Sequence, residues 1–253
     1  MLELQHVSFG VSDDRNKNID IIDDLSLTIE DRKFVVVTGP NGGGKSTLAR
    51  LIAGVERPTS GRILFDGTDI TDMSITDRAK LGISFAFQQP VRFKGLQVVD
   101  LIRLASGNQT LSVSDACEYL SSVGLCARDY ISREVNSSLS GGELKRIEIA
   151  TVLARKTKLS VFDEPEAGID LWSFQNLSRV FEKMREDIRD SSIMIISHQE
   201  RILQIADEVV VLADGKIRQQ GPRDEILPGL IGTDAAVNAC ERLMDGQTNG
   251  RAV

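Results

Sequence analysis

The stretch that decides the fold is Gly39-Pro40-Asn41-Gly42-Gly43-Gly44-Lys45-Ser46-Thr47. It fits the pattern G-x-x-x-x-G-K-[ST], whose fixed positions are occupied by Gly39, Gly44, Lys45 and Ser46. The apolar, β-branched run 34–37 in front of it predicts a buried strand. Behind it, apolar residues recur with helical spacing until Gly54, which is a good helix stop. The stretch therefore predicts a strand, a glycine loop and a helix.

The loop 39–47, called the phosphate loop below, has the composition of an anion-binding site. Its glycines let successive backbone N–H groups point into one concavity, where side chains would collide with phosphate. The helix that begins near Lys45 adds unpaired N–H groups and the positive end of its dipole. Lys45 can reach the β- and γ-phosphates, and Ser46 can place its hydroxyl on Mg²⁺. A plain glycine turn is the alternative, but the Lys-Ser pair and the flanking elements favour ATP with Mg²⁺.

Composition narrows the class of protein. The 253 residues suffice for one large domain or two small ones, and 41% hydrophobic and 26% charged residues are typical of a soluble globular protein. A net charge of −7 argues against nucleic acid as a partner. No apolar run approaches the roughly 20 residues that span a bilayer, and the first residues lack the plan of a signal peptide. We therefore expect a cytoplasmic protein without direct membrane insertion.

The cysteines support the same expectation. There are three, they are scattered, and their odd number argues against a disulfide framework or a Cys-x-x-Cys metal site: Cys117, Cys126 and Cys240.

Strands and helices alternate along most of the chain. Residues 2–9 and 25–29 predict an antiparallel pair joined by a polar loop at 13–18. Further strands are expected at 63–65, 83–87, 159–162, 193–196 and 209–212, with a hairpin turn at 214–215 before a last strand near 217. Residues 91–154 keep helical spacing and predict a helical insert, which ends in a long amphipathic helix. Two later helices are expected at 171–188 and 235–244.

This order predicts an α/β fold with a mostly parallel central sheet covered on both faces, an N-terminal antiparallel β subdomain and a helical subdomain. Residues 1–90 and 155–221 are expected to form the nucleotide-binding core. Residues 91–154 form the helical subdomain. The pattern fades beyond Gly221, so residues 222–253 are treated as a C-terminal extension.

Polar residues follow several of the predicted strands. Because parallel sheets bind ligands beyond the carboxyl ends of their strands, we expect Gly39, Gln88, Asp163 and His198 to meet in one site.

Two adjacent carboxylates, Asp163 and Glu164, follow the apolar strand 159–162. Carboxylates at a buried edge are costly unless a cation compensates them. A Mg²⁺ ion bound to Ser46 would do so, with Asp163 as its carboxylate ligand and Glu164 as the base or water-orienting group for attack on the γ-phosphate. The alternative is an acidic pair that stabilises the start of a helix.

Two further side chains are candidates for the same chemistry. A histidine after a strand is more often a surface or core residue, but His198 lies at the expected edge and can hydrogen-bond the γ-phosphate. The amide of Gln88 can contact both Mg²⁺ and the attacking water, and Gln89 is a near-equal candidate by chemistry alone. His6 has no such context.

Ser140-x-x-Glu143 is a capping box, which satisfies the first N–H groups of the following helix. This structural role leaves the Gly141-Gly142 pair between them able to bind phosphate.

The order of these motifs resembles that of the ATP-binding cassette (ABC) ATPases, over residues 1–221. In that family's terms the phosphate loop is Walker A, and the other motifs are a Q-loop at Gln88, the signature loop Leu139-Ser140-Gly141-Gly142-Glu143, Walker B at 159–164, the D-loop Ala167-Gly168-Ile169-Asp170 and the switch His198. The resemblance implies the P-loop NTPase fold and a head-to-tail dimer around ATP. Ser140, Gly141 and Gly142 would then contact a γ-phosphate bound to the other copy, and Asp170 would touch that copy.

One position departs from most transporter cassettes, which stack an aromatic residue on adenine. Val11 aligns with that position, and Phe9 reads as a strand residue facing the core. Stacking on adenine is therefore not predicted.

Within the superfamily, the likeness is greatest to SufC, the ATPase of the SUF iron–sulfur cluster assembly system. The runs 82–91 and 141–149 are similar to its Q-loop and signature helix, and Val11 also fits, whereas Pro165 and Glu166 depart from its pattern. This likeness implies a SufB/SufD-like scaffold as the partner. The ATPase subunit of a transporter with a separate membrane-spanning partner shares every nucleotide-site residue. Only the partner-docking surface, residues 88–110, would distinguish the two.

A third interpretation is a cassette that uses ATP only as a clamp, as in DNA-repair or translation factors. The acidic balance, the single cassette and the lack of a coiled-coil insertion argue against it.

Overall fold

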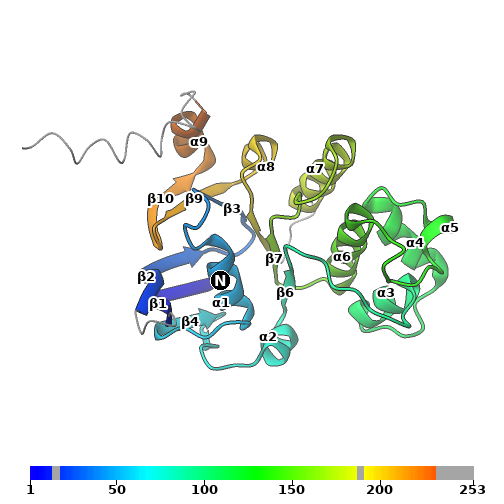
Figure 1. Ribbon diagram of the computed structural model, residues 1–253, viewed down its shortest axis with the longest axis horizontal. Coiled ribbons are helices and arrows are strands. Elements are labelled where there is room, and N and C mark those ends of the chain that lie inside the picture. The colour runs from blue at the N-terminus through cyan, green and yellow to red at the C-terminus, as the bar shows by residue number, and fades with distance from the viewer. Residues whose placement is uncertain (13–17, 187–190, 232–253) are drawn as a thin grey trace, which may run out of the picture.

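The computed structural model describes residues 1–12, 18–186 and 191–231. Its main frame is a 6-stranded sheet with the strand order β10-β9-β3-β8-β7-β6 (Figure 1). All neighbouring strands pair in parallel except β9 and β10, which form an antiparallel hairpin at one edge. The strands are β3 (Phe34–Thr38), β6 (Ile83–Ala86), β7 (Leu159–Asp163), β8 (Ser192–Ile196), β9 (Glu208–Ala213) and β10 (Lys216–Pro222). The mostly parallel sheet predicted from the sequence is confirmed.

A second sheet, fully antiparallel, has the strand order β2-β1-β4-β5. Its strands are β1 (Leu2–Ser12), β2 (Asn18–Ile29), β4 (Ser60–Phe65) and β5 (Thr68–Asp69). The predicted pairing of the first two strands is confirmed, but both strands are longer than the alternation suggested. Irregular register within β1 explains the difference, because bulges interrupt the alternation of apolar residues along the strand.

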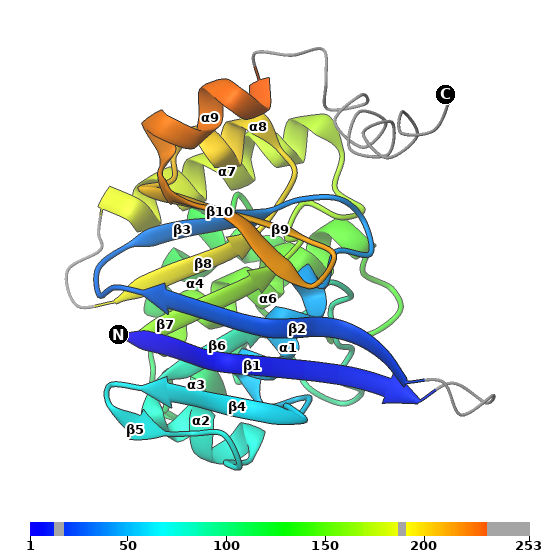
Figure 2. The same ribbon diagram turned by 90° about the vertical axis from the view of Figure 1, so that its left-hand side faces the viewer.

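Helix α1 (Lys45–Ala53) lies between the two sheets, as Figures 1 and 2 show from two sides. Its Leu48 and Leu51 are fully buried in one apolar cluster with Val35 and Val37 of β3 and with Leu4 of β1. The helix that follows the phosphate loop is thus held on two sides. Gly54 ends it in a left-handed conformation, as predicted.

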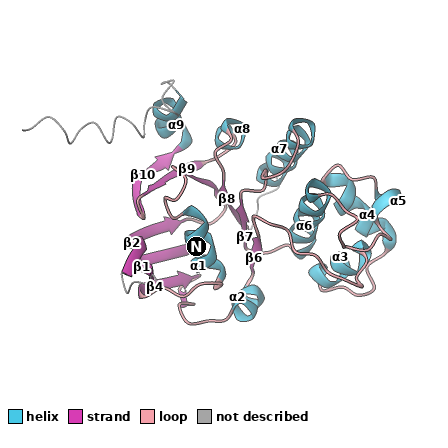
Figure 3. Cartoon of the chain, viewed as in Figure 1, coloured by secondary structure: helices cyan, strands magenta, loops and turns pink. Residues whose placement is uncertain are grey.

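A second group of helices lies on the other face of the central sheet, and Figure 3 shows several of them gathered at the right of the view. Phe34 and Val36, which alternate with Val35 and Val37 along β3, point into this second apolar cluster. The helices are α3 (Val98–Ser106), α4 (Val113–Ser122), α5 (Ala127–Tyr130), α6 (Gly141–Arg155), α7 (Leu171–Glu186) and α8 (Glu200–Gln204). The first four form the predicted helical insert.

Several elements differ from the sequence-based expectation. Helix α6 is not amphipathic: residues on several of its sides are buried, because it lies between β6 and the helices α3 and α4. Three helices escaped prediction, α8 and the helices α2 (Ile75–Leu81) and α9 (Arg223–Ile231). The latter packs on α8 and β10 despite an internal proline at Pro228. The predicted end of α7 at 188 and the helix at 235–244 lie outside the described residues.

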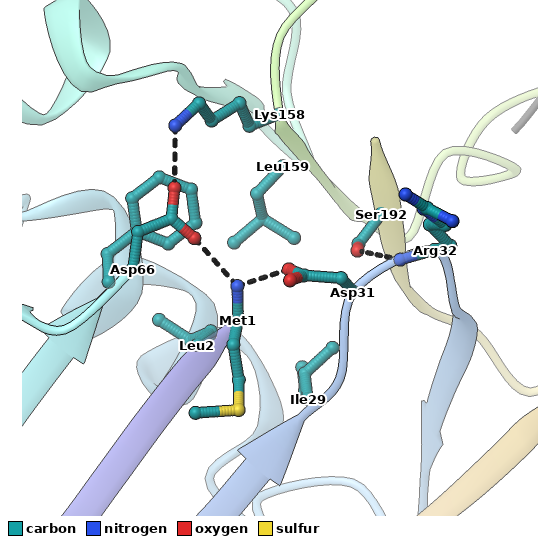
Figure 4. Close-up of a pocket in the computed structure, with 10 residues that line it drawn as sticks. Met1, Leu2, Ile29, Asp31, Arg32, Asp66, Lys158, Leu159 and Ser192 are labelled. Atoms are coloured by element: carbon teal, nitrogen blue, oxygen red, sulfur yellow. Dashed lines mark hydrogen bonds and ion pairs between the residues drawn. The ribbon is translucent and has the colours of Figure 1, made fainter. Parts of the chain in front are cut away.

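A pocket of about 450 Å³ opens at the amino ends of β7 and β8 (Figure 4). In it the Met1 amine donates to Asp31 and, over 2.7 Å, to Asp66, whose other oxygen accepts from Lys158 over 2.6 Å. These ion pairs join the two sheets. The pocket lies at the edge opposite the carboxyl ends of the strands, so it is separate from the predicted ligand site. Within the described part of the chain, no helix has the length and hydrophobicity to cross a membrane.

Arg78, on α2, is fully buried and has no carboxylate hydrogen-bonded to it among the described residues. Its guanidinium instead donates to the carbonyls of Leu51 and Ile52, at the end of α1, and to those of Thr71 and Met73. Burial lowers the pKa of Arg78 to about 10, so the side chain stays charged at neutral pH. It places a cation at the negative end of the α1 dipole. The missed helix α2 thus fixes the far end of the helix that begins at the phosphate loop.

Replacing Arg78 with Met should destabilise the protein, because it leaves buried carbonyls without donors. We expect a loss of about 3 kcal/mol in the free energy of unfolding, measured by urea denaturation. The control is Lys80→Ala on the same helix, where the side chain is 73% exposed and the loss should stay within about 0.5 kcal/mol. Equal stability of the Arg78 variant and this control would contradict the capping role.

Candidate functional site

The phosphate loop runs from the end of β3 to the start of α1. Close packing excludes a side chain at some of its glycines but not at all of them. A Cβ added at Gly39 would lie 2.0 Å from the Leu212 carbonyl oxygen of β9, and one at Gly44 would lie 2.7 Å from Cδ1 of Ile22 on β2. At Gly42 the added atom would meet no described atom within 4 Å. Packing against both sheets therefore fixes the loop, and the predicted collision with phosphate can apply only on its open side.

Lys45 is 5% exposed and folds back over the loop. Its Nζ donates to the carbonyl oxygens of Gly39 and Pro40, over 2.8 and 2.9 Å. Burial lowers the pKa of Lys45, and the nearby Glu164 and Asp163 oppose that shift. The ammonium is thus held at the loop by carbonyls, ready to exchange them for phosphate oxygens. Asn41 is exposed on the same loop, and Thr47 lies one residue beyond Ser46 in α1.

Asp163 and Ser46 meet at the end of β7. The Ser46 Oγ donates to Asp163 Oδ1 over 2.9 Å, and Asp163 is 1% exposed. Burial raises the pKa of Asp163, repulsion by Glu164 adds to the shift, and the hydrogen bond from Ser46 opposes it. A hydroxyl and a carboxylate at this spacing are the oxygen ligands that Mg²⁺ prefers. Among the described residues no group of three or more His, Cys, Asp or Glu could hold a metal, so water and phosphate would complete the shell.

Glu164 lies at the centre of the remaining contacts. Its Oε2 accepts from the Gln88 amide over 2.6 Å, and its Oε1 is 3.9 Å from Nε2 of His198. Its backbone has a φ of 44°, a left-handed conformation that costs a non-glycine residue about 1–3 kcal/mol. The expected meeting of the strand-end residues is therefore confirmed. Of the two glutamines, Gln88 is the one that contacts Glu164.

Burial lowers the pKa of His198, the charge of Lys45 lowers it further, and Glu164 opposes both. The imidazole is therefore mostly neutral at pH 7, with one N–H to donate. Such a group can bond an anion without carrying charge.

The signature loop lies elsewhere, at the start of α6 in the helical subdomain (Figure 1). Ser140 and Glu143 form the predicted capping box, with hydrogen bonds of 2.6 and 3.3 Å. A Cβ added at Gly141 or Gly142 would meet no described atom within 4 Å. The start of this helix is thus open. Asp170 is exposed directly before α7, and its carbonyl accepts from Phe174 N over 2.8 Å.

Val11 lies near the end of β1, where it pairs with Ile19 of β2. The two side chains are 44% and 52% exposed. Two aliphatic side chains thus lie at the position for which the sequence predicted no aromatic stacking on adenine.

The sequence analysis missed a pair of charged residues on α6 that hold the loop carrying Gln88. Lys145 is fully buried and donates to the carbonyls of Phe87 and, over 3.3 Å, Gln88. Glu148 accepts from the backbone N–H of Phe87 over 3.0 Å and lies 3.3 Å from the Lys145 ammonium. Lysine and glutamate three residues apart on a helix commonly form an exposed pair, so only the packing shows their contact with this loop.

Comparison with known proteins identifies relatives of this chain. The family model described as "ABC transporter" matches residues 22–167, which include the phosphate loop, the signature loop and the Asp163–Glu164 pair. An uncharacterised ABC transporter ATP-binding protein of Methanocaldococcus jannaschii is 37% identical over 216 residues, covering 83% of this chain and 86% of that protein. A sulfate/thiosulfate import ATP-binding protein, CysA, of Synechococcus elongatus is 34% identical over 81% of this chain. The chain spans only 59% of that CysA.

Solved structures confirm the predicted fold. The dimeric ATP-binding cassette MJ0796, in a post-hydrolysis state with ADP and phosphate, superposes with a TM-score of 0.78. It is 22% identical, and the match covers 88% of this chain and 99% of MJ0796. A nucleotide-free cassette from an ABC transporter superposes with a TM-score of 0.75 over 94% of this chain.

Replacing Asp163 with Asn should separate stability from function. The Asp163 carboxyl has a higher pKa in the folded state than in the unfolded state. Its contribution to the stability of the folded protein is therefore present below the pKa of the unfolded state, and it is lost as pH rises through the pKa of the folded state. At pH 7 the ionised group therefore costs stability, and the neutral amide should raise the melting temperature of the ligand-free protein by a few degrees, about 2–4 °C per kcal/mol. MgATP should then stabilise the variant less than the wild type.

Thermal melts at pH 7 with and without MgATP give both numbers. The control is Asp129→Asn, an exposed position on α5 that should change neither. A variant that melts lower than the wild type without ligand, or gains as much from MgATP, would contradict the assignment of Asp163.

Proposed function

Since the chain belongs to the ABC transporter family, whose members hydrolyse ATP, we propose that it is the ATPase subunit of a transporter with separate membrane-spanning subunits. Its relatives named above are ATP-binding proteins of transporters, and one of them is matched over 86% of its length. No described helix could span a membrane, so the proposed transport path would lie in other chains.

The proposal rests on one observation: the groups suited to bind ATP are divided between the edge of the central sheet and the helical subdomain. Lys45, Asp163, Glu164 and His198 converge at one edge of the central sheet. The open helix start at Gly141 belongs to the helical subdomain, whose α6 packs on α3, α4 and β6. An uncovered helix N-terminus with two glycines suits a phosphate. We propose that it meets the γ-phosphate bound to a second copy, arranged head to tail, while Asp170 contacts that copy.

In this proposal each side chain has one role in hydrolysis. Lys45 exchanges its loop carbonyls for the β- and γ-phosphates, and the loop N–H groups bind the same oxygens. Ser46, Asp163 and Gln88 would hold Mg²⁺, which neutralises charge that develops on the phosphates. Glu164 accepts a proton from the attacking water, which Gln88 orients. Neutral His198 donates its N–H to the γ-phosphate.

A surface beside Gln88 suits the docking of a partner. Phe87, Val91, Phe93 and Leu104 are 37%, 47%, 41% and 58% exposed, which is high for large apolar side chains close together in the chain. Lys145 and Glu148 tie this region to α6. Movement of the docked partner would therefore be linked to both Gln88 and the signature loop.

A second candidate partner is a soluble SufB/SufD-like scaffold for iron–sulfur cluster assembly. The similarity of runs 82–91 and 141–149 to SufC favours it. The relatives named above carry transporter names instead, so the transporter remains the first proposal.

Replacing Glu164 with Gln should abolish ATP turnover, by about 100-fold or more, because the amide cannot accept the proton. The ATP-bound dimer should then accumulate and be visible by analytical ultracentrifugation with MgATP. Exposed Glu200→Gln is the matched control and should behave as the wild type. Normal turnover in the Glu164 variant would contradict its role as base.

Isolation of the native complex decides between the partners. A tag on this chain should recover, from detergent-solubilised membranes, a protein with several membrane-spanning segments. Substitution of Phe93 and Leu104 by Glu should abolish that recovery without lowering ATP affinity. Recovery of a soluble scaffold from the membrane-free fraction would overturn the transporter proposal in favour of the second candidate.

A further inference from the structure

We propose that Glu166 is a positioning residue for ATP hydrolysis, which holds Glu164 and His198 in place through its hydrogen bond with Ser197. The proposal rests on the roles given above to Glu164 and His198. Glu166 is one of the two residues that depart from the SufC pattern, and no role was predicted for it.

The geometry joins the two loops that carry the reactive side chains. Glu166 follows β7 by three residues, and Ser197 follows β8 directly. The Ser197 Oγ donates to Glu166 Oε1 over 2.5 Å. The same oxygen of Ser197 accepts from the Gln199 N–H over 3.0 Å, and the Ser197 N–H donates to Val37 of β3 over 3.2 Å. Ser197 is therefore anchored, fully buried, at the base of the loop that presents His198.

The turn that presents Glu164 needs such an anchor. The left-handed backbone of Glu164 is unfavourable for a residue with a side chain, so surrounding contacts must hold it. One contact is the hydrogen bond from Glu164 N to the Ile196 carbonyl, over 3.1 Å. The second contact is the hydrogen bond between Glu166 and Ser197, which lies one residue beyond Ile196, directly after β8. Together they fasten this turn across the ends of the neighbouring strands β7 and β8 (Figure 1).

The surroundings of Glu166 fit a positioning role. Burial raises its pKa, and repulsion by Glu164 adds to the shift, while hydrogen bonds from Ser197 and from the His198 backbone oppose it. Its Oε2 is shut off from solvent and has no hydrogen-bond partner among the described atoms. A carboxyl with a raised pKa is protonated more readily than a free one, and it can accept from Ser197 in either form. The isosteric amide of glutamine can make the same bond.

The test compares four substitutions in the full-length chain by steady-state ATPase kinetics, MgATP binding and thermal melts. Glu166→Met keeps the volume but removes the acceptor, and Ser197→Ala removes the donor. Each should lower kcat by about 10-fold, because reacting groups displaced by a fraction of an ångström lose rate steeply. The double variant should lose no more than Ser197→Ala alone, since both substitutions remove the bond between Glu166 and Ser197 and Ser197→Ala also removes the acceptor of the Gln199 N–H. Glu166→Gln should restore most of the wild-type kcat.

The readouts separate positioning from stability. MgATP affinity should stay within about twofold, because the phosphate loop is untouched. Ser178→Ala removes another fully buried hydroxyl, which donates to Phe174 within α7, and should keep wild-type kcat. Wild-type kcat in Ser197→Ala, or failure of Glu166→Gln to rescue, would overturn the proposal. So would losses that simply add in the double variant. Glu164→Gln, assayed alongside, shows separately whether the base assignment itself fails.

Discussion

The buried contact between Asp163 and Ser46 is the constraint on which the rest of the site depends. It joins the end of β7 to the start of α1, and it places a carboxylate where water cannot stabilise it. The raised pKa of Asp163 means that the ligand-free protein carries an electrostatic cost. In the proposed function, a cation bound with phosphate would remove that cost and would link the stability of this region to nucleotide. Lys45, held by loop carbonyls rather than by a carboxylate, is prepared for the same ligand.

The side chains proposed to act on ATP are held by the backbone of the central sheet, and the loop proposed to respond to a partner lies outside it. Glu164 and His198 are fastened across β7 and β8. Gln88, by contrast, is exposed on a loop that Lys145 and Glu148 tie to α6. Movement of the helical subdomain would therefore shift Gln88 and the signature loop together, relative to a fixed base and phosphate loop. Such an arrangement links hydrolysis to the position of whatever docks beside Gln88.

The sequence predicted the parts of this molecule that local patterns determine. Buried strands read as apolar runs, and strand-end positions placed Gln88, Asp163 and His198 at one edge because parallel strands share an orientation. The sequence could not decide between Gln88 and Gln89. Only the fold shows that Gln88 is the one that contacts Glu164. Helix α2 escaped because Arg78 is its one buried residue, so the helix has no apolar periodicity to recognise. Lys145, Glu148 and Glu166 escaped because charged residues are expected in solvent, and only packing shows where they are buried.

In the proposed function, one chain supplies only half of each ATP site. Cross-linking tests it most directly, with cysteine introduced at Asn41 in one chain and at Gly141 in another, after Cys117, Cys126 and Cys240 are changed to serine. Oxidation with ATP and Mg²⁺ should give a covalent dimer when the two chains are mixed, and much less of it without ATP. Cross-linking within a single chain that carries both cysteines, or no ATP-dependent dimer in the mixture, would contradict it.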